Sequence, residues 1–119
     1  MEKGVKRMTA DRDSIRAARN EILLRDLNER IEAHHEWVNS PLSEWVCECA
    51  DENCSEPVHL SIEEYQAVRA EPTHFLVVPG AEHIDPHIEH VVRREERYWV
   101  LEKIGVGAVM SEELDPRSP

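Results

Sequence analysis

The chain has few aromatic residues and no long apolar stretch. Its 119 residues include three tryptophans, two tyrosines and one phenylalanine, so few large side chains are available for a core and a bound metal would add stability. No segment approaches the roughly 20 apolar residues that span a bilayer, and the first residues lack an apolar signal-peptide core. We therefore expect one small domain in the cytoplasm.

Positive charge is also scarce. Lysine and arginine together number 14, against 25 aspartate and glutamate residues, which gives a formal net charge of −11. This balance opposes partners whose binding depends on neutralising phosphates or anionic lipid. The most compact basic group, Arg93, Arg94 and Arg97, is interrupted by Glu95 and Glu96. We predict that neither nucleic acid nor a membrane is a partner.

Motifs typical of nucleophilic and phosphate-binding enzymes are missing from the sequence. No strand-turn-helix signature places a serine or cysteine beside a base. Gly105 and Gly107 do not belong to a phosphate-binding loop, and we interpret them as the end of a strand. Glu48, Asp51 or Glu52 could act as acid or base beside an open metal position, so a small metal-dependent enzyme or enzyme subunit stays an alternative. The sequence favours a protein without catalytic activity.

One long amphipathic helix is predicted near the N-terminus, from about residue 11 to residue 36. Its apolar positions, mostly three and four residues apart, are Ile15, Ala18, Ile22, Leu24, Leu27, Ile31 and Val38. The polar positions, expected at the surface, are Arg16, Arg19, Arg25, Asp26, Glu29, Arg30 and Glu32. Such a helix is longer than a small sheet can cover, so part of its stripe would contact another chain, in a homodimer or with a different protein partner. The alternative is that the whole stripe packs on the chain's own sheet.

The remaining sequence predicts short strands and one short helix. Strands are expected at residues 45–49, 58–60, 75–78, 88–93 and 98–104, the last two forming a hairpin. Ser61 and Glu64 have the spacing of a capping box, which starts a helix ending near Arg69. The predicted fold class is α+β, with the long helix packed on a small, mainly antiparallel sheet, one short helix and a hairpin that carries the cysteines. Residues 1–9 are expected to be a mobile N-terminus, residues 10–110 a single domain and residues 111–119 a disordered tail.

Three closely spaced cysteines form the most specific motif. In the predicted strand Cys47 and Cys49 point to the same side, because side chains alternate along a strand. The turn that follows lets Cys54 return toward them. Zinc in structural sites favours four tetrahedral ligands drawn from sulfur and imidazole nitrogen, so a closed site requires one more ligand from elsewhere in the chain.

We predict His83 as this fourth ligand. It follows the pair Pro79-Gly80 at the end of a predicted strand, and such a turn can swing a loop side chain across a neighbouring hairpin. His59 ranks next, since the strand after the third cysteine stays near the motif. The full set of alternatives is His59, His74, His87 and the carboxylate of Asp51.

The cysteine motif also limits the functions that the chain could have. An odd number of clustered thiols fits a disulfide framework poorly and, in a reducing compartment, more often binds metal. We therefore predict that residues 10–110 form a single zinc-binding α+β domain with a zinc-clasped hairpin. The preferred interpretation is a small intracellular protein-interaction or regulatory module whose Zn²⁺ is structural. A thiol-based redox or metal sensor is the first alternative, because thiolates that bind zinc are also oxidisable. Three reduced thiols without metal are the plainest alternative.

Two resemblances accompany the motif. The spacing Cys-x-Cys-x4-Cys resembles the post-SET zinc motif of lysine methyltransferases, in which three such cysteines take their fourth ligand from a distant segment; the likeness covers residues 47–54. A broader pattern resembles a group of short actinobacterial proteins, from which no activity is carried over. It comprises Arg19-Asn20-Glu21, Asn28-Glu29-Arg30, Cys47-Glu48-Cys49-Ala50-Asp51, Cys54, Glu64-Tyr65, Val68-Arg69, Phe75, Pro79-Gly80, Glu102-Lys103 and Asp115-Pro116. In that group a histidine follows the Pro-Gly pair, whereas here Ala81 and Glu82 precede His83.

Overall fold

The chain folds into one long helix, two small antiparallel sheets and further short helices. The computed structural model describes residues 2–35, 42–54 and 56–117, and within the first helix the side chains of residues 12–34. In chain order the elements are α1 (Glu2–His35), β1 (Ser43–Val46), β2 (Pro57–Leu60), α2 (Ile62–Arg69), β3 (His74–Val77), η1 (Ala81–His83), β4 (Glu89–Arg94), β5 (Trp99–Lys103) and α3 (Val106–Glu113). The α+β class is confirmed.

The strands form two sheets. β1 pairs with β2, and β5 lies between β3 and β4; every pairing is antiparallel. The predicted hairpin of β4 and β5 is confirmed, with a register shift between Val91 and Arg93. The capping box is confirmed as well, since Ser61 accepts a hydrogen bond from the backbone of Glu64 and the Glu64 side chain accepts one from Ser61.

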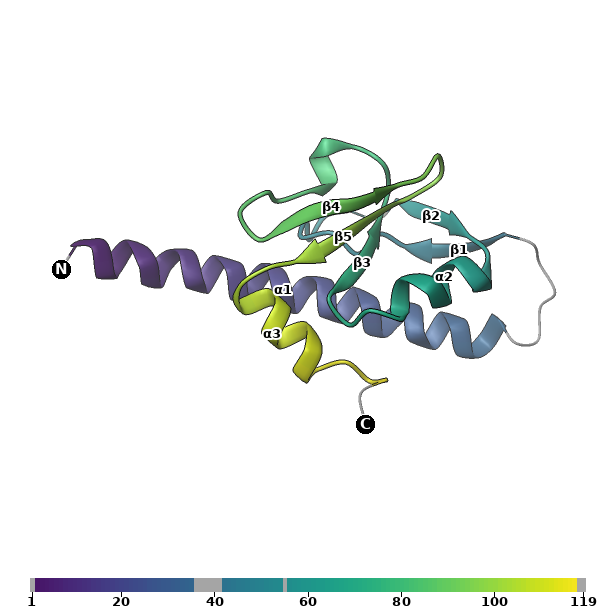
Figure 1. The fold of residues 1–119 in the computed structure, drawn as a ribbon, viewed down its shortest axis with the longest axis horizontal. Coiled ribbons are helices and arrows are strands. Elements are labelled where there is room, and N and C mark those ends of the chain that lie inside the picture. Colours follow the sequence, from purple (N-terminus) through teal and green to yellow (C-terminus); the bar gives the residue numbers. More distant parts are fainter. Residues whose placement is uncertain (1, 36–41, 55, 118–119) are drawn as a thin grey trace.

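The helix α1 runs along the longest dimension of the molecule, which measures 57 × 32 × 23 Å, and both sheets lie on one side of it (Figure 1). Its N-terminal part projects beyond the sheets, as expected for a helix longer than the sheet it covers. The sequence predicts a helix from about residue 11; in the structure it already begins at Glu2. No proline precedes Pro41 in the sequence, so nothing forces a later start. The predicted stripe residue Val38 lies outside the described residues.

The apolar core lies between the sheets and α2. Trp45 and Tyr65 stack with ring centroids 4.1 Å apart and an interplanar angle of 6°, and the Trp45 indole donates to Leu60 O at 3.0 Å. The other large buried apolar side chains include Val58, Phe75, Leu76, Tyr98 and Leu101. The core thus uses four of the few aromatic residues of the chain.

The buried face of α1 is more polar than the sequence pattern indicates. Besides Ala18 and Ile22 it consists of Glu21, Arg25 and Asn28, each fully buried. Leu27, assigned to the apolar stripe, is 41% exposed, and Leu23 is 67% exposed. The expectation that Arg25 lies at the surface is wrong. The two terminal nitrogens of its guanidinium donate to carbonyl oxygens, of Pro72 at 2.8 Å and Ser111 at 3.1 Å, while the buried Nε has no hydrogen-bond partner among the described residues.

A buried ion cluster joins α1 to the larger sheet. The ammonium group of Lys103 donates to carboxylate oxygens of Glu21 and Glu89, and all three side chains are fully buried. The ammonium nitrogen of Lys103 also lies 5.4 Å from the ring centroid of Phe75, and the guanidinium carbon of Arg25 lies 5.0 Å from the same centroid. Ion pairs and contacts between cations and this aromatic ring therefore replace part of the apolar packing that a regular amphipathic helix would supply.

The end of the chain is ordered where the sequence predicts a strand end and a disordered tail. Gly105, with φ of 65°, lies in the turn after β5, and α3 begins at the next residue. Ser111 is fully buried on α3, and Asp115 forms an ion pair with Arg69 at 2.5 Å. Arg117 donates to Glu29 at 2.5 and 2.9 Å. Residues 106–117 therefore pack on α1, and residues 118–119 lie outside the described part.

Candidate metal centre

The first two cysteines lie in an irregular segment after β1, which ends at Val46 instead of continuing through Cys49 as predicted. The segment leaves the β1–β2 ladder and runs beside β3. Glu48 anchors it there twice, because its backbone N–H donates to Leu76 O at 2.9 Å and its carboxylate accepts from Leu76 N at 3.0 Å. The backbone N–H of Val78 donates to the sulfur of Cys47 at 3.3 Å.

Two asparagines of α1 hold the same segment from the other side. The amide nitrogen of Asn28 donates to Val46 O at 2.9 Å and to Glu48 Oε2 at 2.8 Å, while its oxygen accepts from Val46 N at 2.9 Å. Asn20 donates to Cys49 O at 3.1 Å. The backbone that carries the two thiols is thus fixed between α1 and β3.

A tight turn brings Cys54 back to this segment. The carboxylate of Asp51 accepts from the backbone N–H of Asn53 at 2.9 Å, and the Asp51 carbonyl accepts from that of Cys54 at 3.1 Å. Cys49 and Cys54 therefore flank one compact loop, as the spacing of the motif predicts.

His83 arrives from the turn after β3. Gly80 has φ of 142°, and a Cβ there would lie 2.6 Å from the Glu82 carboxylate, so the position requires glycine. The backbone N–H of His83 donates to Gly80 O at 3.2 Å in the single turn of η1. The turn directs the imidazole inward, where it is 7% exposed.

These four side chains converge. One ligand atom from each of Cys47, Cys49, Cys54 and His83 lies within 4.8 Å of all the others. His83 Nδ1 is 3.6 Å from the sulfur of Cys47 and 3.8 Å from that of Cys54. Zinc–sulfur bonds of about 2.3 Å and zinc–nitrogen bonds of about 2.0 Å at tetrahedral angles give a sulfur–nitrogen separation of about 3.5 Å. The cluster could hold a metal ion with little rearrangement.

The second ring nitrogen of His83 faces carboxylates. Nε2 lies 2.9 Å from Glu56 and 3.7 Å from Glu82. Burial lowers the pKa of His83, but the neighbouring Cys49 thiolate and the two carboxylates raise it by more. A carboxylate that accepts a hydrogen bond from Nε2–H keeps the proton on Nε2 and leaves Nδ1 available as a ligand. This arrangement is typical of histidines that bind metal.

The three thiols differ in acidity. A hydrogen bond from the Cys47 thiol, with further donors including His83, lowers the pKa of Cys49 to about 5. The same bond to Cys49, together with burial, raises the pKa of Cys47. Burial also raises that of Cys54. One thiolate thus forms readily, and a bound cation would supply the charge that stabilises the others. All three cysteines are free of disulfides.

The alternative fourth ligands lie elsewhere. His59 faces Glu44 at 3.4 Å, and His74 faces Glu102 at 3.2 Å. The backbone N–H of His87 donates to Asp85 in an exposed turn. The carboxylate of Asp51 is engaged in the turn before Cys54, so it shapes the loop and lies outside the group of converging ligand atoms.

Sequence reasoning missed the residues that position the cluster. Glu56 is exposed and separated from His83 along the chain, and no pattern links the two. Asn28 falls among the polar positions of a helix, so only its contact with the cysteine segment reveals its role. For Glu48 the sequence did offer a signal, since this residue lies between the two predicted ligands Cys47 and Cys49.

The comparisons with known proteins give no assignment. No protein-family model matches the chain, and neither the curated proteins nor the solved structures contain a match. Over the described ranges, none of the helices combines the length and the apolar character needed to cross a bilayer.

Proposed function

We propose that this chain is a small zinc-binding protein-interaction or regulatory module, in which Zn²⁺ held by Cys47, Cys49, Cys54 and His83 is structural. The observation that carries the proposal is the convergence of these ligand atoms within 4.8 Å from three separate segments. A metal there would join the segment after β1, the loop before β2 and the turn after β3. Such a link stabilises a fold with a modest apolar core.

The donor set favours zinc over other metals. Thiolate and imidazole ligands in a tetrahedral arrangement are typical of structural zinc sites, whereas calcium and magnesium prefer oxygen. A fourth ligand from a distant segment is also what the resemblance to the post-SET motif implies. With four protein ligands, no position is left open for a substrate or a catalytic water.

The surroundings of the cluster support a structural role over a catalytic one. Glu48 is fully buried and accepts hydrogen bonds from Asn28 and Leu76, so its carboxylate does not face a substrate. Glu52 is bound to Arg16 at 2.8 Å. These two candidates for acid or base therefore serve to position segments. The function of the module would lie in its surface, through contact of α1 with a protein partner or a second copy.

Elemental analysis of freshly purified, reduced protein tests the proposal. We expect one zinc ion per chain and a loss of cooperative unfolding after chelation. His83→Ala is expected to lower the zinc affinity, whereas the matched variant His59→Ala, at a half-exposed histidine outside the cluster, is expected to retain it. An absence of metal together with three freely reactive thiols would refute the zinc site.

A redox or metal sensor is the second candidate, and the partial exposure of Cys54 favours it. A thiolate that reaches solvent can be oxidised, and the loss of zinc would then release the loop between Cys49 and Cys54. Mild peroxide separates the two functions. Reversible zinc release with α1 still helical would support the sensor, while zinc retained until the protein unfolds would support the structural role.

A further inference from the structure

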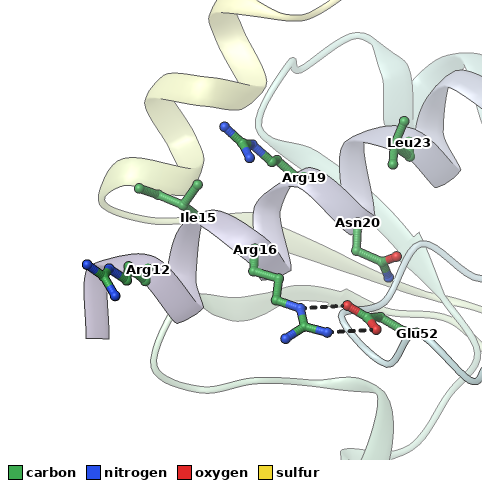
Figure 2. A pocket seen from close by; sticks show the side chains of 7 residues that line it. All are labelled: Arg12, Ile15, Arg16, Arg19, Asn20, Leu23 and Glu52. Carbon is green, nitrogen blue, oxygen red and sulfur yellow. Dashed lines mark hydrogen bonds and ion pairs between the residues drawn. The ribbon is translucent and has the colours of Figure 1, made fainter. Parts of the chain in front are cut away.

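The exposed side of α1 carries a basic hollow of about 440 Å³ (Figure 2). Its lining residues are Arg12, Ile15, Arg16, Arg19, Asn20, Leu23 and Glu52. We call it the arginine groove. From this groove we infer that the module binds an acidic amphipathic helix of a protein partner. The inference rests on the proposed function, because it identifies the interaction surface and the chemistry of the partner.

The groove combines apolar surface with unpaired positive charge. Leu23 is 67% exposed at one end, and Ile15 is partly exposed. Arg12 and Arg19 are exposed and have no hydrogen-bond or ion-pair partner within the described part of the chain. Figure 2 shows both side chains pointing away from Glu52. Two guanidinium groups are therefore available to carboxylates of a ligand.

The third arginine connects the groove to the metal cluster. Arg16 forms a two-pronged ion pair with Glu52, at 2.8 and 3.1 Å (Figure 2). Glu52 belongs to the loop between Cys49 and Cys54, so the loop closed by the cysteine cluster forms one wall of the groove. Among the described residues that line the groove Glu52 is the only acidic one, and it competes with an acidic ligand for Arg16.

Charge decides between possible occupants. The arginines lie on one side of a helix, so a second helix laid along them could place leucines on Leu23 and glutamates beside the guanidinium groups. A second copy pairing symmetrically through this face would oppose arginine to arginine. The net charge of −11 opposes every anionic ligand, but it opposes a nucleic acid or an anionic membrane more than a short helix, whose few carboxylates can be confined to the groove. An acidic helix fits both the local charge and the apolar surface.

Peptide binding to the full, metal-loaded chain tests the inference. The probe is a synthetic amphipathic helix with leucines on one face and glutamates on its flanks, labelled for fluorescence anisotropy. Its control carries lysine at each glutamate position. We expect the glutamate peptide to bind and the lysine peptide to bind at least about tenfold more weakly. Equal binding of the two peptides would overturn the inference.

Three variants locate the binding site. The double variant Arg12→Glu and Arg19→Glu is expected to weaken binding at least about tenfold, and the matched double change Arg93→Glu and Arg94→Glu on the exposed end of β4 is expected to leave it unchanged. Glu52→Gln is expected to tighten binding about threefold, because it frees Arg16. Unchanged affinity in the double variant, with its circular dichroism spectrum intact, would place the peptide elsewhere and refute the groove.

The remaining outcomes separate this inference from the proposed function. Preferential binding of anionic vesicles or of a single-stranded oligonucleotide at the arginines would overturn it, and so would a dimer in light scattering that Leu23→Asp converts to a monomer. Metal content is measured in every variant. If zinc is retained but the peptide does not bind, the proposed groove is refuted. If the peptide binds to a chain that contains no zinc, the proposed metal site is refuted.

Discussion

Replacement of Asn28 tests how the cysteine segment is held in place. This side chain is fully buried and makes three hydrogen bonds, two to Val46 and one to Glu48, at 2.8 to 2.9 Å. Asn28→Ala removes all three and leaves two backbone groups and one carboxylate oxygen without that partner. The segment would then lose its attachment to α1 immediately before Cys47, the first residue of the candidate metal centre.

The expected loss follows from the groups left unpaired. Each buried polar group deprived of its partner costs about 1–3 kcal/mol, and Glu48 also keeps its bond from Leu76. Allowing for relaxation and entry of water, we expect Asn28→Ala to lower the free energy of unfolding by about 3–5 kcal/mol. That is a large share of the stability of a domain of this size, which is about 5–15 kcal/mol.

Urea unfolding followed by circular dichroism measures the change. The matched control is Leu27→Ala, which truncates a neighbouring and 41% exposed side chain of the same helix and is expected to cost less than about 1 kcal/mol. If Asn28→Ala unfolds at the same urea concentration as Leu27→Ala, the three hydrogen bonds do not anchor the segment and our account of the site's construction is wrong.

Two further predictions concern ion pairs made by glutamates of α1. Arg117→Ala should destabilise the fold by about 1 kcal/mol at neutral pH and by less in acid. Burial raises the pKa of Glu29, but the hydrogen bond from Arg117 and the other partners of Glu29 hold this pKa below its usual value. The stability that the ion pair contributes is therefore present above the unfolded pKa and lost as the pH falls. Urea unfolding at neutral and acid pH checks the prediction, and an equal effect of Arg117→Ala at both pH values would contradict it. Lys103→Met should cost about 3–5 kcal/mol, because it leaves the buried carboxylates of Glu21 and Glu89 without their cation. Thermal unfolding checks this, and a neutral result would show that the cluster ionises differently.

Local patterns were sufficient to predict most elements of the fold. The capping box at Ser61 depends on residues three apart, and the hairpin of β4 and β5 depends on two strands that are close together in the chain, so both are visible in the sequence. The convergence of Cys47, Cys49, Cys54 and His83 was predictable for a similar reason. The cysteine spacing requires a return of the chain, and Gly80 with the preceding proline marks the turn that carries His83 inward.

The buried side of α1 could not be predicted in the same way. Periodicity assigns Leu27 to the apolar stripe, yet it is 41% exposed, while Glu21 and Arg25 are buried. Two of their partners, Lys103 and the carbonyl of Ser111, lie more than eighty positions away along the chain. Only the tertiary fold shows which groups these buried charges contact. The helix α3 was missed because its apolar residues follow two glycines, which resemble the end of a strand.

X-ray absorption spectroscopy at the zinc edge of the purified protein tests the central claim most directly. The account predicts one zinc ion per chain with three sulfur neighbours at about 2.3 Å and one nitrogen neighbour at about 2.0 Å. In the His83→Ala variant the nitrogen neighbour should be lost or replaced by a solvent oxygen while the sulfur shell remains. A spectrum without sulfur neighbours, or an imidazole signal unchanged in His83→Ala, would contradict the assignment of Cys47, Cys49, Cys54 and His83 as the ligands.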